Sequence, residues 1–297
     1  MLTELTIKPS PLLVGYDEEL TKLTKYINNG NPCLIYGDYG VGKTSALLYL
    51  YKKFKGKYSV IYVSGDFIIS LDHFKKEIKK RLNFIDRILG KEFPKNALIL
   101  LDEADKVPDE VIYHLKEAYD LGKIRSFVLA AVNPDVFPES ILHRIGERKV
   151  HLKGIKREHV LEFFKKRVSE KILDIIEERV LYRIWEVTKG NPRKMLELLE
   201  RVLSLKEERK LEKVKLEDIK DLLKVEEREK KIKLTPLQKK IISILEDGPK
   251  TLKEIAEILN ISIYSAGARI SELKRLGLIE EIPGRPKKYK LKSSLPL

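Results

Sequence analysis

One short segment constrains this chain more than any other: the run Gly37-Asp-Tyr-Gly-Val-Gly-Lys-Thr44. An apolar stretch, Cys33 to Tyr36, precedes it and predicts a strand, and residues 44–54 have the pattern of a helix. Glycines at this spacing let the backbone curl so that its N–H groups converge on phosphate oxygens, next to the positive end of the following helix. The segment therefore predicts a phosphate cradle that binds ATP or ADP.

The residue types in this segment suggest individual roles. Lys43 is expected to bind the β- and γ-phosphates, and the hydroxyl of Thr44 to ligate Mg²⁺. We call residues 37–44 the phosphate loop. The predicted nucleotide-binding residues here are Gly37, Asp38, Tyr39, Gly40, Val41, Gly42, Lys43, Thr44 and Ser45.

Three further apolar runs, at residues 60–63, 97–101 and 127–132, are separated by helical patterns. Apolar strands that alternate with helices are typical of a parallel sheet covered on both faces. Residues 1–155 are therefore predicted to form an α/β nucleotide-binding domain. From about residue 156 amphipathic helices replace the strands, at 158–167, 175–188 and 192–205. They predict a small all-α domain over 156–230, in which the charged segment 205–233 forms an exposed helix leading into a linker.

Two adjacent carboxylates end the apolar run at 97–101. Asp102 and Glu103 would lie at the carboxyl end of a buried strand, beside the phosphates. Asp102 is then expected to hold Mg²⁺ and Glu103 to polarise the attacking water. The alternative is that both residues only cap a helix after a core strand.

The last part of the chain, residues 231–297, has the pattern of a helix-turn-helix followed by two strands. Ala266, Ile270 and Leu273 form the apolar stripe of its third helix. This leaves Ile263, Tyr264, Ser265 and Arg269 to face a DNA major groove, and Arg285, Lys287 and Lys288 to contact DNA from the turn between the strands. The pattern resembles a winged helix-turn-helix DNA-binding domain, although such a domain can also serve protein contacts.

The composition bears on the partner, on disulfide bonds and on the compartment of this protein. The formal net charge is +14, which indicates a polyanionic partner or a solvated basic surface. Cys33 is the only cysteine, so an intramolecular disulfide is excluded. The chain lacks an apolar run near the roughly 18 residues that a membrane span needs, so we expect a cytoplasmic protein without a membrane partner. The abundance of Lys and Glu is typical of a heat-adapted organism.

Residues 37–44 and 97–103 together resemble the Walker A and Walker B motifs of the AAA+ ATPases. The resemblance implies a sensor-1 role for Asn133, and a second-unit sensor-2 role for Arg193 in Gly190-Asn-Pro-Arg193. It also implies that Arg144, or else Arg148, is an arginine finger that reaches the nucleotide of a neighbouring subunit. Asn133 could instead belong to a plain turn, Arg144 could be a surface charge, and Arg193 only a first-turn helix residue.

The segment from Leu13 to Leu20 is similar to the N-terminal box of the same family. That likeness places Val14 and Tyr16 near the adenine, although many relatives have arginine where this chain has Tyr16. The implied catalytic set is Lys43, Glu103, Asn133, Arg144 and Arg193.

The order of the three parts resembles the archaeal initiator family related to the origin recognition and Cdc6 proteins. It implies a slow ATPase that binds duplex DNA under nucleotide control during replication. The chain departs from that family at Gly190-Asn-Pro-Arg193, where initiators commonly have Gly-Asp-x-Arg. Two alternatives stay open: an oligomeric branch-migration motor, and a nucleotide-sensing transcriptional regulator or mobile-element target selector with little hydrolysis.

Overall fold

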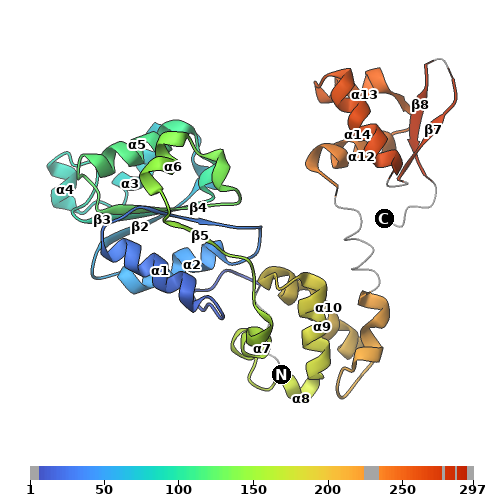
Figure 1. The fold of residues 1–297 in the computed structure, drawn as a ribbon, viewed down its shortest axis with the longest axis horizontal. Helices are drawn as coiled ribbons and strands as arrows, with labels where there is room; N and C mark the ends of the chain where they lie inside the picture. The colour runs from blue at the N-terminus through green and yellow to red at the C-terminus, as the bar shows by residue number, and fades with distance from the viewer. Residues whose placement is uncertain (1–6, 224–233, 276–277, 285, 293–297) are drawn as a thin grey trace. The chain divides into compact units, whose positions relative to one another are not determined.

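A computed structural model describes residues 7–223, 234–275, 278–284 and 286–292 of the chain (Figure 1). The chain divides into two compact units, residues 1–220 and 221–297. Within the described ranges, no helix is both long enough and apolar enough to cross a membrane. The predicted domain boundaries after residues 155 and 230 stay predictions.

The first unit is built on a parallel sheet of five strands, in the order β2-β3-β4-β1-β5. The strands are β1 (Cys33–Tyr36), β2 (Ser59–Ser64), β3 (Ala97–Asp102), β4 (Ser126–Ala131) and β5 (Lys149–His151). The predicted α/β class is confirmed. The sequence did not indicate β5, because a strand of three residues with only its middle one, Val150, buried leaves almost no pattern.

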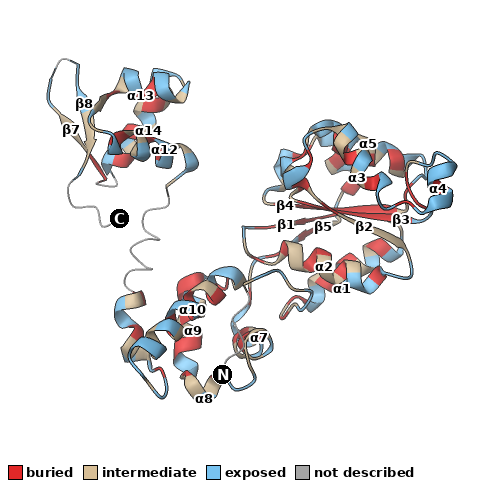
Figure 2. Cartoon of the chain, turned by 180° about the vertical axis from the view of Figure 1, so that it is seen from behind, coloured by how far each residue is buried: buried red, intermediate tan, exposed pale blue. Residues whose placement is uncertain are grey.

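Helices cover both faces of this sheet, which explains why β3 and β4 are buried along their whole length and mostly apolar (Figure 2). One face carries α1 (Asp17–Asn28) and α2 (Lys43–Phe54). The other face carries α3 (Leu71–Lys79), α4 (Phe84–Ile88), α5 (Asp109–Asp120) and α6 (Glu139–Ile145). Short 3₁₀ turns follow three strands: η1 (Gly65–Phe67), η2 (Ala104–Lys106) and η3 (Pro134–Val136). We call this part the base.

A helical subdomain, the lid, follows the sheet in the same unit. A 3₁₀ turn, η4 (Arg157–His159), leads into α7 (Val160–Arg167), α8 (Ile172–Ile175), α9 (Glu178–Thr188) and α10 (Pro192–Glu208). The predicted exposed helix from residue 205 is not continuous in its described part, because α10 ends at Glu208. After Glu208 the chain turns back, Val214 pairs with Ile176, and η5 (Leu216–Ile219) buries Ile219. Residues 224–233 lie outside the described ranges.

The segment that joins base and lid bonds to both. The N–H of Leu152 donates to the carbonyl of Tyr36 in the base at 2.8 Å, and the N–H of Ile155 donates to the carbonyl of Gly190 in the lid at 2.7 Å. Gly154 lies so close to Gly190 that a Cβ there would be 2.8 Å from the Gly190 carbonyl oxygen, so only glycine fits.

In its described residues from 234 onward, the second unit has three helices and a small antiparallel sheet, in the order β6-β8-β7. Its elements are α12 (Pro236–Glu246), β6 (Lys250–Thr251), α13 (Leu252–Leu259), α14 (Ile263–Arg275), β7 (Ile279–Ile282) and β8 (Lys288–Leu291). Ala266, Ile270 and Leu273 of α14 pack into its core, as predicted. The unit is a winged helix.

Candidate nucleotide site and winged-helix surface

The phosphate loop connects β1 to the first turn of α2, as the sequence predicted. Its glycines Gly37, Gly40 and Gly42 have φ values of 147°, 80° and 108°, which side chains of L-residues rarely adopt. A Cβ on Gly37 would also lie 2.3 Å from the carbonyl oxygen of Leu152. The loop can therefore curl tightly only because these positions are glycine.

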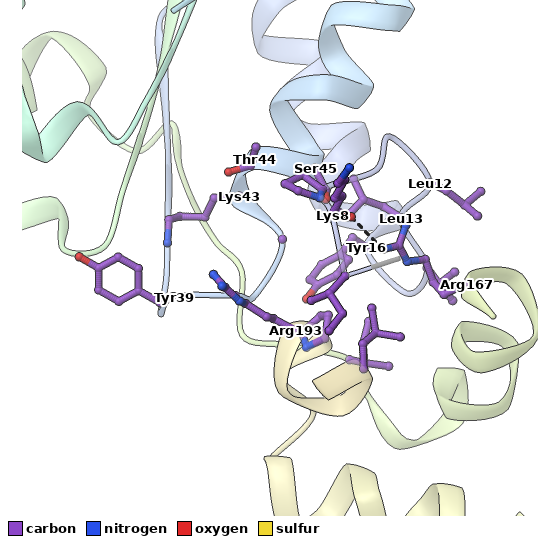
Figure 3. Close-up of a pocket in the computed structure, with 18 of the residues that line it drawn as sticks. Lys8, Leu12, Leu13, Tyr16, Tyr39, Lys43, Thr44, Ser45, Arg167 and Arg193 are labelled. Carbon is purple, nitrogen blue, oxygen red and sulfur yellow. Dashed lines mark hydrogen bonds between the residues drawn. The ribbon is translucent and has the colours of Figure 1, made fainter. Parts of the chain in front are cut away.

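Lys43 folds back over this loop. Its Nζ donates hydrogen bonds to the carbonyl oxygens of Gly37 at 2.7 Å and Asp38 at 3.0 Å, and the residue is only 8 % exposed. Burial lowers the pKa of the Lys43 ammonium, against the opposing pull of nearby carboxylates, Asp102 first among them. A cation is thus placed at the loop, close to the ring of Tyr39 (Figure 3).

Asp102 ends β3 and borders the same cavity as Lys43 and Thr44. One carboxylate oxygen, Oδ2, accepts a hydrogen bond from the Tyr62 hydroxyl at 2.8 Å, and Oδ1 accepts from the N–H of Glu103 at 3.0 Å. Burial, with the Asp102 carboxylate adding to it, raises the pKa of the Tyr62 hydroxyl, so Tyr62 remains a donor that holds Asp102 in place. The sequence did not single out Tyr62.

Glu103 takes part in a three-residue charge cluster. Its carboxylate forms an ion pair with Lys106, whose Nζ also donates to Oδ1 of Asp66 at 2.5 Å. Burial raises the pKa of Glu103; the Lys106 ammonium opposes that rise, and Asp66 adds to it. The same ammonium lowers the pKa of Asp66. The sequence analysis did not identify Asp66 or Lys106 as part of the site. The sequence signal, a lysine three residues after Glu103, is too weak by itself to predict an ion pair.

A cavity of about 700 Å³ joins the loop to the lid. The predicted Val14 and Tyr16 line it, and the Tyr16 hydroxyl donates to the carbonyl of Val41 at 2.7 Å. Burial raises the pKa of that hydroxyl, so it stays protonated. Other residues that line the cavity were not predicted: Ile7, Lys8, Leu13, Ile155, Phe163, Arg167 and Leu196. The cavity therefore has an apolar part beside the phosphate loop, as a purine base requires (Figure 3).

The lid bonds directly to the phosphate loop. The side chain of Asn191, which caps α10, donates from Nδ2 to the carbonyl of Tyr39 at 2.7 Å. The N–H of Arg193 donates to the carbonyl of Gly40 at 3.3 Å, and its Nε pairs with Glu197 at 3.0 Å. Figure 3 shows the Arg193 side chain between the lid and the phosphate loop, and this residue lines the cavity. The sequence identified Arg193 but missed Asn191.

Asn133 and the two candidate finger residues lie elsewhere. Asn133 accepts a hydrogen bond from the N–H of Asp135 at 3.0 Å and borders a second hollow, next to Gly37 and Asp38. Arg144 forms an ion pair with Asp120 at 2.5 Å, and the Nε of Arg148 donates to the carbonyl of Pro32 at 3.0 Å. None of the three lines the 700 Å³ cavity. A role for Arg144 at a neighbouring subunit stays a prediction.

Helix α14 of the winged helix presents an exposed face. Tyr264 is 90 % exposed and Ile263 is also exposed, whereas Arg269 is held by Glu272 at 3.0 Å. The N–H of Ser265 donates to Oγ of Ser262 at the start of the helix. Tyr264, Ala268, Ser271 and Arg275 are all exposed and follow a helical spacing, so Arg275 joins the surface that the sequence placed around Arg269.

Two of the predicted wing cations lie at the start of β8: Lys288 is its first residue, and Lys287 directly precedes it. Lys288 is exposed, and Lys287 pairs with Glu281 at 2.8 Å. Ion pairs with Lys274 and Lys287 lower the pKa of Glu281 to about 2, so this carboxylate neutralises part of the wing. Arg285 lies outside the described ranges.

Together these features define a P-loop nucleotide-binding unit followed by a winged helix. Residues 29–153 match the family model described as "AAA domain". Residues 230–294 match the model described as "Sugar-specific transcriptional regulator TrmB". The chain thus combines an AAA domain with a C-terminal winged-helix domain of the TrmB kind.

Solved structures share this arrangement. The fold is similar to that of Cdc6p from Pyrobaculum aerophilum, with a TM-score of 0.58 and 16 % identity over 98 % of this chain and 94 % of that one. It is also similar to the RuvB Holliday junction branch migration motor of Thermotoga maritima, with a TM-score of 0.56 and 16 % identity over 94 % and 93 % of the two chains. At this identity the likeness shows the fold alone. Among curated proteins, no sequence matches the chain.

Proposed function

We propose that this protein binds and slowly hydrolyses ATP, and that the bound nucleotide controls how it binds duplex DNA. The observation that carries the proposal is the direct bonding of lid to phosphate loop through Asn191 and Arg193. A ligand that fills the loop must act on residues that also position the lid. Nucleotide state is thereby converted into a change of shape.

The residues of the base fit Mg²⁺ and ATP. Lys43 binds the β- and γ-phosphates, and Thr44 and Asp102 hold Mg²⁺, as the oxygen donors of a hydroxyl and a carboxylate suit this ion. Bound Mg²⁺–ATP supplies the transferable phosphoryl group. Glu103 polarises the water that attacks it, so that ADP and inorganic phosphate leave.

Three other residues complete the proposed site. Arg193 of the lid contacts the γ-phosphate, since it already lines the cavity. Asn133 orients the attacking water from the second hollow beside the loop. Arg144 serves the site of another AAA+ subunit, where a guanidinium stabilises charge on the transferred group; to do so it must leave Asp120.

The winged helix supplies the DNA contacts. Ile263, Tyr264 and Arg275 on the exposed face of α14 face base edges, with Ser265 and Arg269 beside them. Lys287 and Lys288 reach the phosphates from the wing. The net charge of +14 supports a polyanionic partner.

Within this class we favour a replication initiator of the Cdc6 kind, supported by the likeness in fold over nearly the whole chain. One observation favours a second candidate: the winged helix matches the TrmB transcriptional regulators. Mapping the chromosomal binding sites separates the two. A single sharp peak at a replication origin supports the initiator, and peaks scattered over promoters support the regulator.

Glu103→Gln tests the proposed chemistry. Loss of the carboxylate should lower ATP hydrolysis by about a hundredfold or more while the Kd for ATP is kept. The matched control is Glu117→Gln on the exposed face of α5, which should hydrolyse normally. DNA binding of the Glu103→Gln variant, measured by fluorescence anisotropy, should still depend on ATP. Undiminished hydrolysis would remove Glu103 from the mechanism, and DNA binding indifferent to ATP and ADP would refute nucleotide control.

A further inference from the structure

Helix α4 of the base has its polarity reversed. Its aspartate, Asp86, is buried at 6 % exposure, whereas Phe84, Ile85 and Ile88 are 77 %, 67 % and 68 % exposed. Leu89, directly after the helix, is 63 % exposed. A surface helix normally buries its apolar residues and exposes its charges, so this one presents an apolar surface to its surroundings (Figure 2).

Several bonds hold α4 in this orientation. Asn83 caps the helix by accepting from the N–H of Asp86 at 2.7 Å, and Lys91 pairs with Asp86 at 2.7 Å. The Arg87 guanidinium donates to the carbonyls of Leu82 and Lys80 at 3.1 and 3.0 Å. These bonds therefore hold α4 in the orientation that exposes its apolar side chains.

Cations surround this apolar surface. A hollow of about 570 Å³ beside α4 is lined by Lys76, Lys79, Lys80, Arg87 and Lys91. The segment 72–92 carries seven lysines and arginines against four aspartates and glutamates. Three of these carboxylates pair with a lysine or arginine of the same segment: Glu77 with Arg81 at 3.2 Å, Asp86 with Lys91 at 2.7 Å and Glu92 with Lys75 at 3.6 Å. The segment keeps an excess of three positive charges. The surroundings of α4 are thus basic.

The exposed apolar side chains and the basic surroundings of α4 together indicate what kind of partner binds there. A second copy of α4 would bring its own basic rim against this one, so the charges oppose self-pairing. Duplex DNA would satisfy the cations but leave the apolar side chains in water, unless they unstacked base steps. An anionic lipid surface satisfies both, because apolar side chains enter the acyl boundary while Lys and Arg meet the lipid phosphates.

We propose that α4 and the basic hollow beside it, residues 76–91, form a peripheral docking surface for an anionic lipid bilayer. The surface lies at the end of the base opposite the lid (Figure 1), and α4 leads into the amino end of β3, whereas the phosphate loop follows the carboxyl end of β1. It is independent of the ATP chemistry, so a bilayer could be bound while the nucleotide cavity stays accessible. The chain needs no membrane-spanning helix for this role.

Co-sedimentation of the full chain with large unilamellar vesicles tests the proposal. Vesicles of phosphatidylglycerol should bind the protein at least tenfold more tightly than vesicles of phosphatidylcholine. The double variant Ile85→Ser/Ile88→Ser should lose that binding at least tenfold, whereas Val136→Ser, an exposed apolar residue of η3, should not. Lys76→Gln/Lys79→Gln should also lose it, and Lys22→Gln/Lys25→Gln on α1, with the same change of net charge, should not.

Other occupants give different results with the same variants. Weaker binding of the Ile85→Ser/Ile88→Ser variant to a 30-base-pair duplex, with vesicle binding unchanged, would overturn the proposal in favour of nucleic acid. Sedimentation velocity would overturn the proposal in favour of self-association if the wild type is an oligomer and this variant is a monomer, again with vesicle binding unchanged. Absence of binding to phosphatidylglycerol vesicles would overturn it outright. Unchanged melting temperature and ATP affinity in the variants show that fold and nucleotide site are intact.

Discussion

The side-chain amide of Asn191 donates a hydrogen bond of 2.7 Å to the main-chain carbonyl of Tyr39, and so binds the first turn of lid helix α10 to the phosphate loop. The oxygen of the same amide accepts from the N–H of Lys194 and caps α10. Asparagine can do both because it carries a donor and an acceptor, whereas an ionised aspartate is only an acceptor. This accounts for Gly-Asn-Pro-Arg in a place where the initiators commonly have Gly-Asp-x-Arg.

The pair Asn191→Asp and Asn191→Ala separates the two bonds. Aspartate keeps the cap but loses the bond to Tyr39, so ATP affinity should fall about fivefold, the equivalent of one hydrogen bond of about 1 kcal/mol. Alanine loses both bonds and should also lower the free energy of unfolding by about 1 kcal/mol. Isothermal titration calorimetry and urea unfolding measure the two effects. Equal ATP affinity for wild type and Asn191→Asp would show that the lid bond does not serve nucleotide binding.

Gly40→Ala should disturb the same contact from the loop side. A Cβ at this position would lie 2.8 Å from both Cβ of Arg193 and Oδ1 of Asn191. Gly56→Ala is the matched control, since Gly56 also has a positive φ, 95°, but nothing lies within 4 Å of its added Cβ. Both variants carry a backbone strain of about 1–2 kcal/mol. Only Gly40→Ala should weaken ATP binding, and comparable weakening by Gly56→Ala would mean that strain alone is responsible.

Lys43→Ala should abolish nucleotide binding. It removes the buried cation that lies over the carbonyls of Gly37 and Asp38, and with it the charge that attracts phosphate. Titration with a fluorescent ATP analogue measures the effect. Binding of duplex DNA by the winged helix should persist in the absence of ATP. Tight ATP binding by this variant would disprove the assignment of the phosphate loop.

Lys106→Met should change the pH dependence of hydrolysis. The Lys106 ammonium favours the ionised form of Glu103, and its removal should raise the pKa of that carboxyl beyond the rise that burial already causes. Because the proposed base must be ionised, the acidic limb of the kcat profile should move to higher pH. ATP affinity should be unchanged, since Lys106 does not line the cavity.

Two controls accompany the Lys106 profile. Lys106→Arg retains the charge and should leave the acidic limb in place. Lys116→Met removes a cation that pairs with Asp120 on α5, and should not move the limb either. An acidic limb at the same pH in Lys106→Met and wild type would show that Lys106 does not act on the hydrolytic base.

The sequence predicted those parts of the site that are contiguous in the chain. The phosphate loop, the run ending in Asp102 and Glu103, and the core stripe of α14 each carry a local pattern, and the structure has all three as predicted. The strand β5 was not predicted, because three residues are too few to show a strand pattern.

Residues recruited from distant segments could not be predicted in the same way. Asn191 and Tyr39 are 152 positions apart, and Lys106 and Asp66 are 40 apart, so their pairing depends on the completed fold. Arg269 shows that a partner nearby in the sequence can also be missed. The sequence predicted that it faces DNA, which stays a prediction, but did not indicate that Glu272, one helical turn later, pairs with its guanidinium.

The bonds on either side of Lys153 and Gly154 determine how the lid can move. Leu152 is bonded to the sheet through Tyr36, and Ile155 to the lid through Gly190, so only two residues between them are bonded to neither in this way. Of these two residues Gly154, with a φ of 111°, has the wider range of backbone conformations. A change in the angle between base and lid would therefore act on Lys153 and Gly154, and it would also have to break the bond between Asn191 and Tyr39.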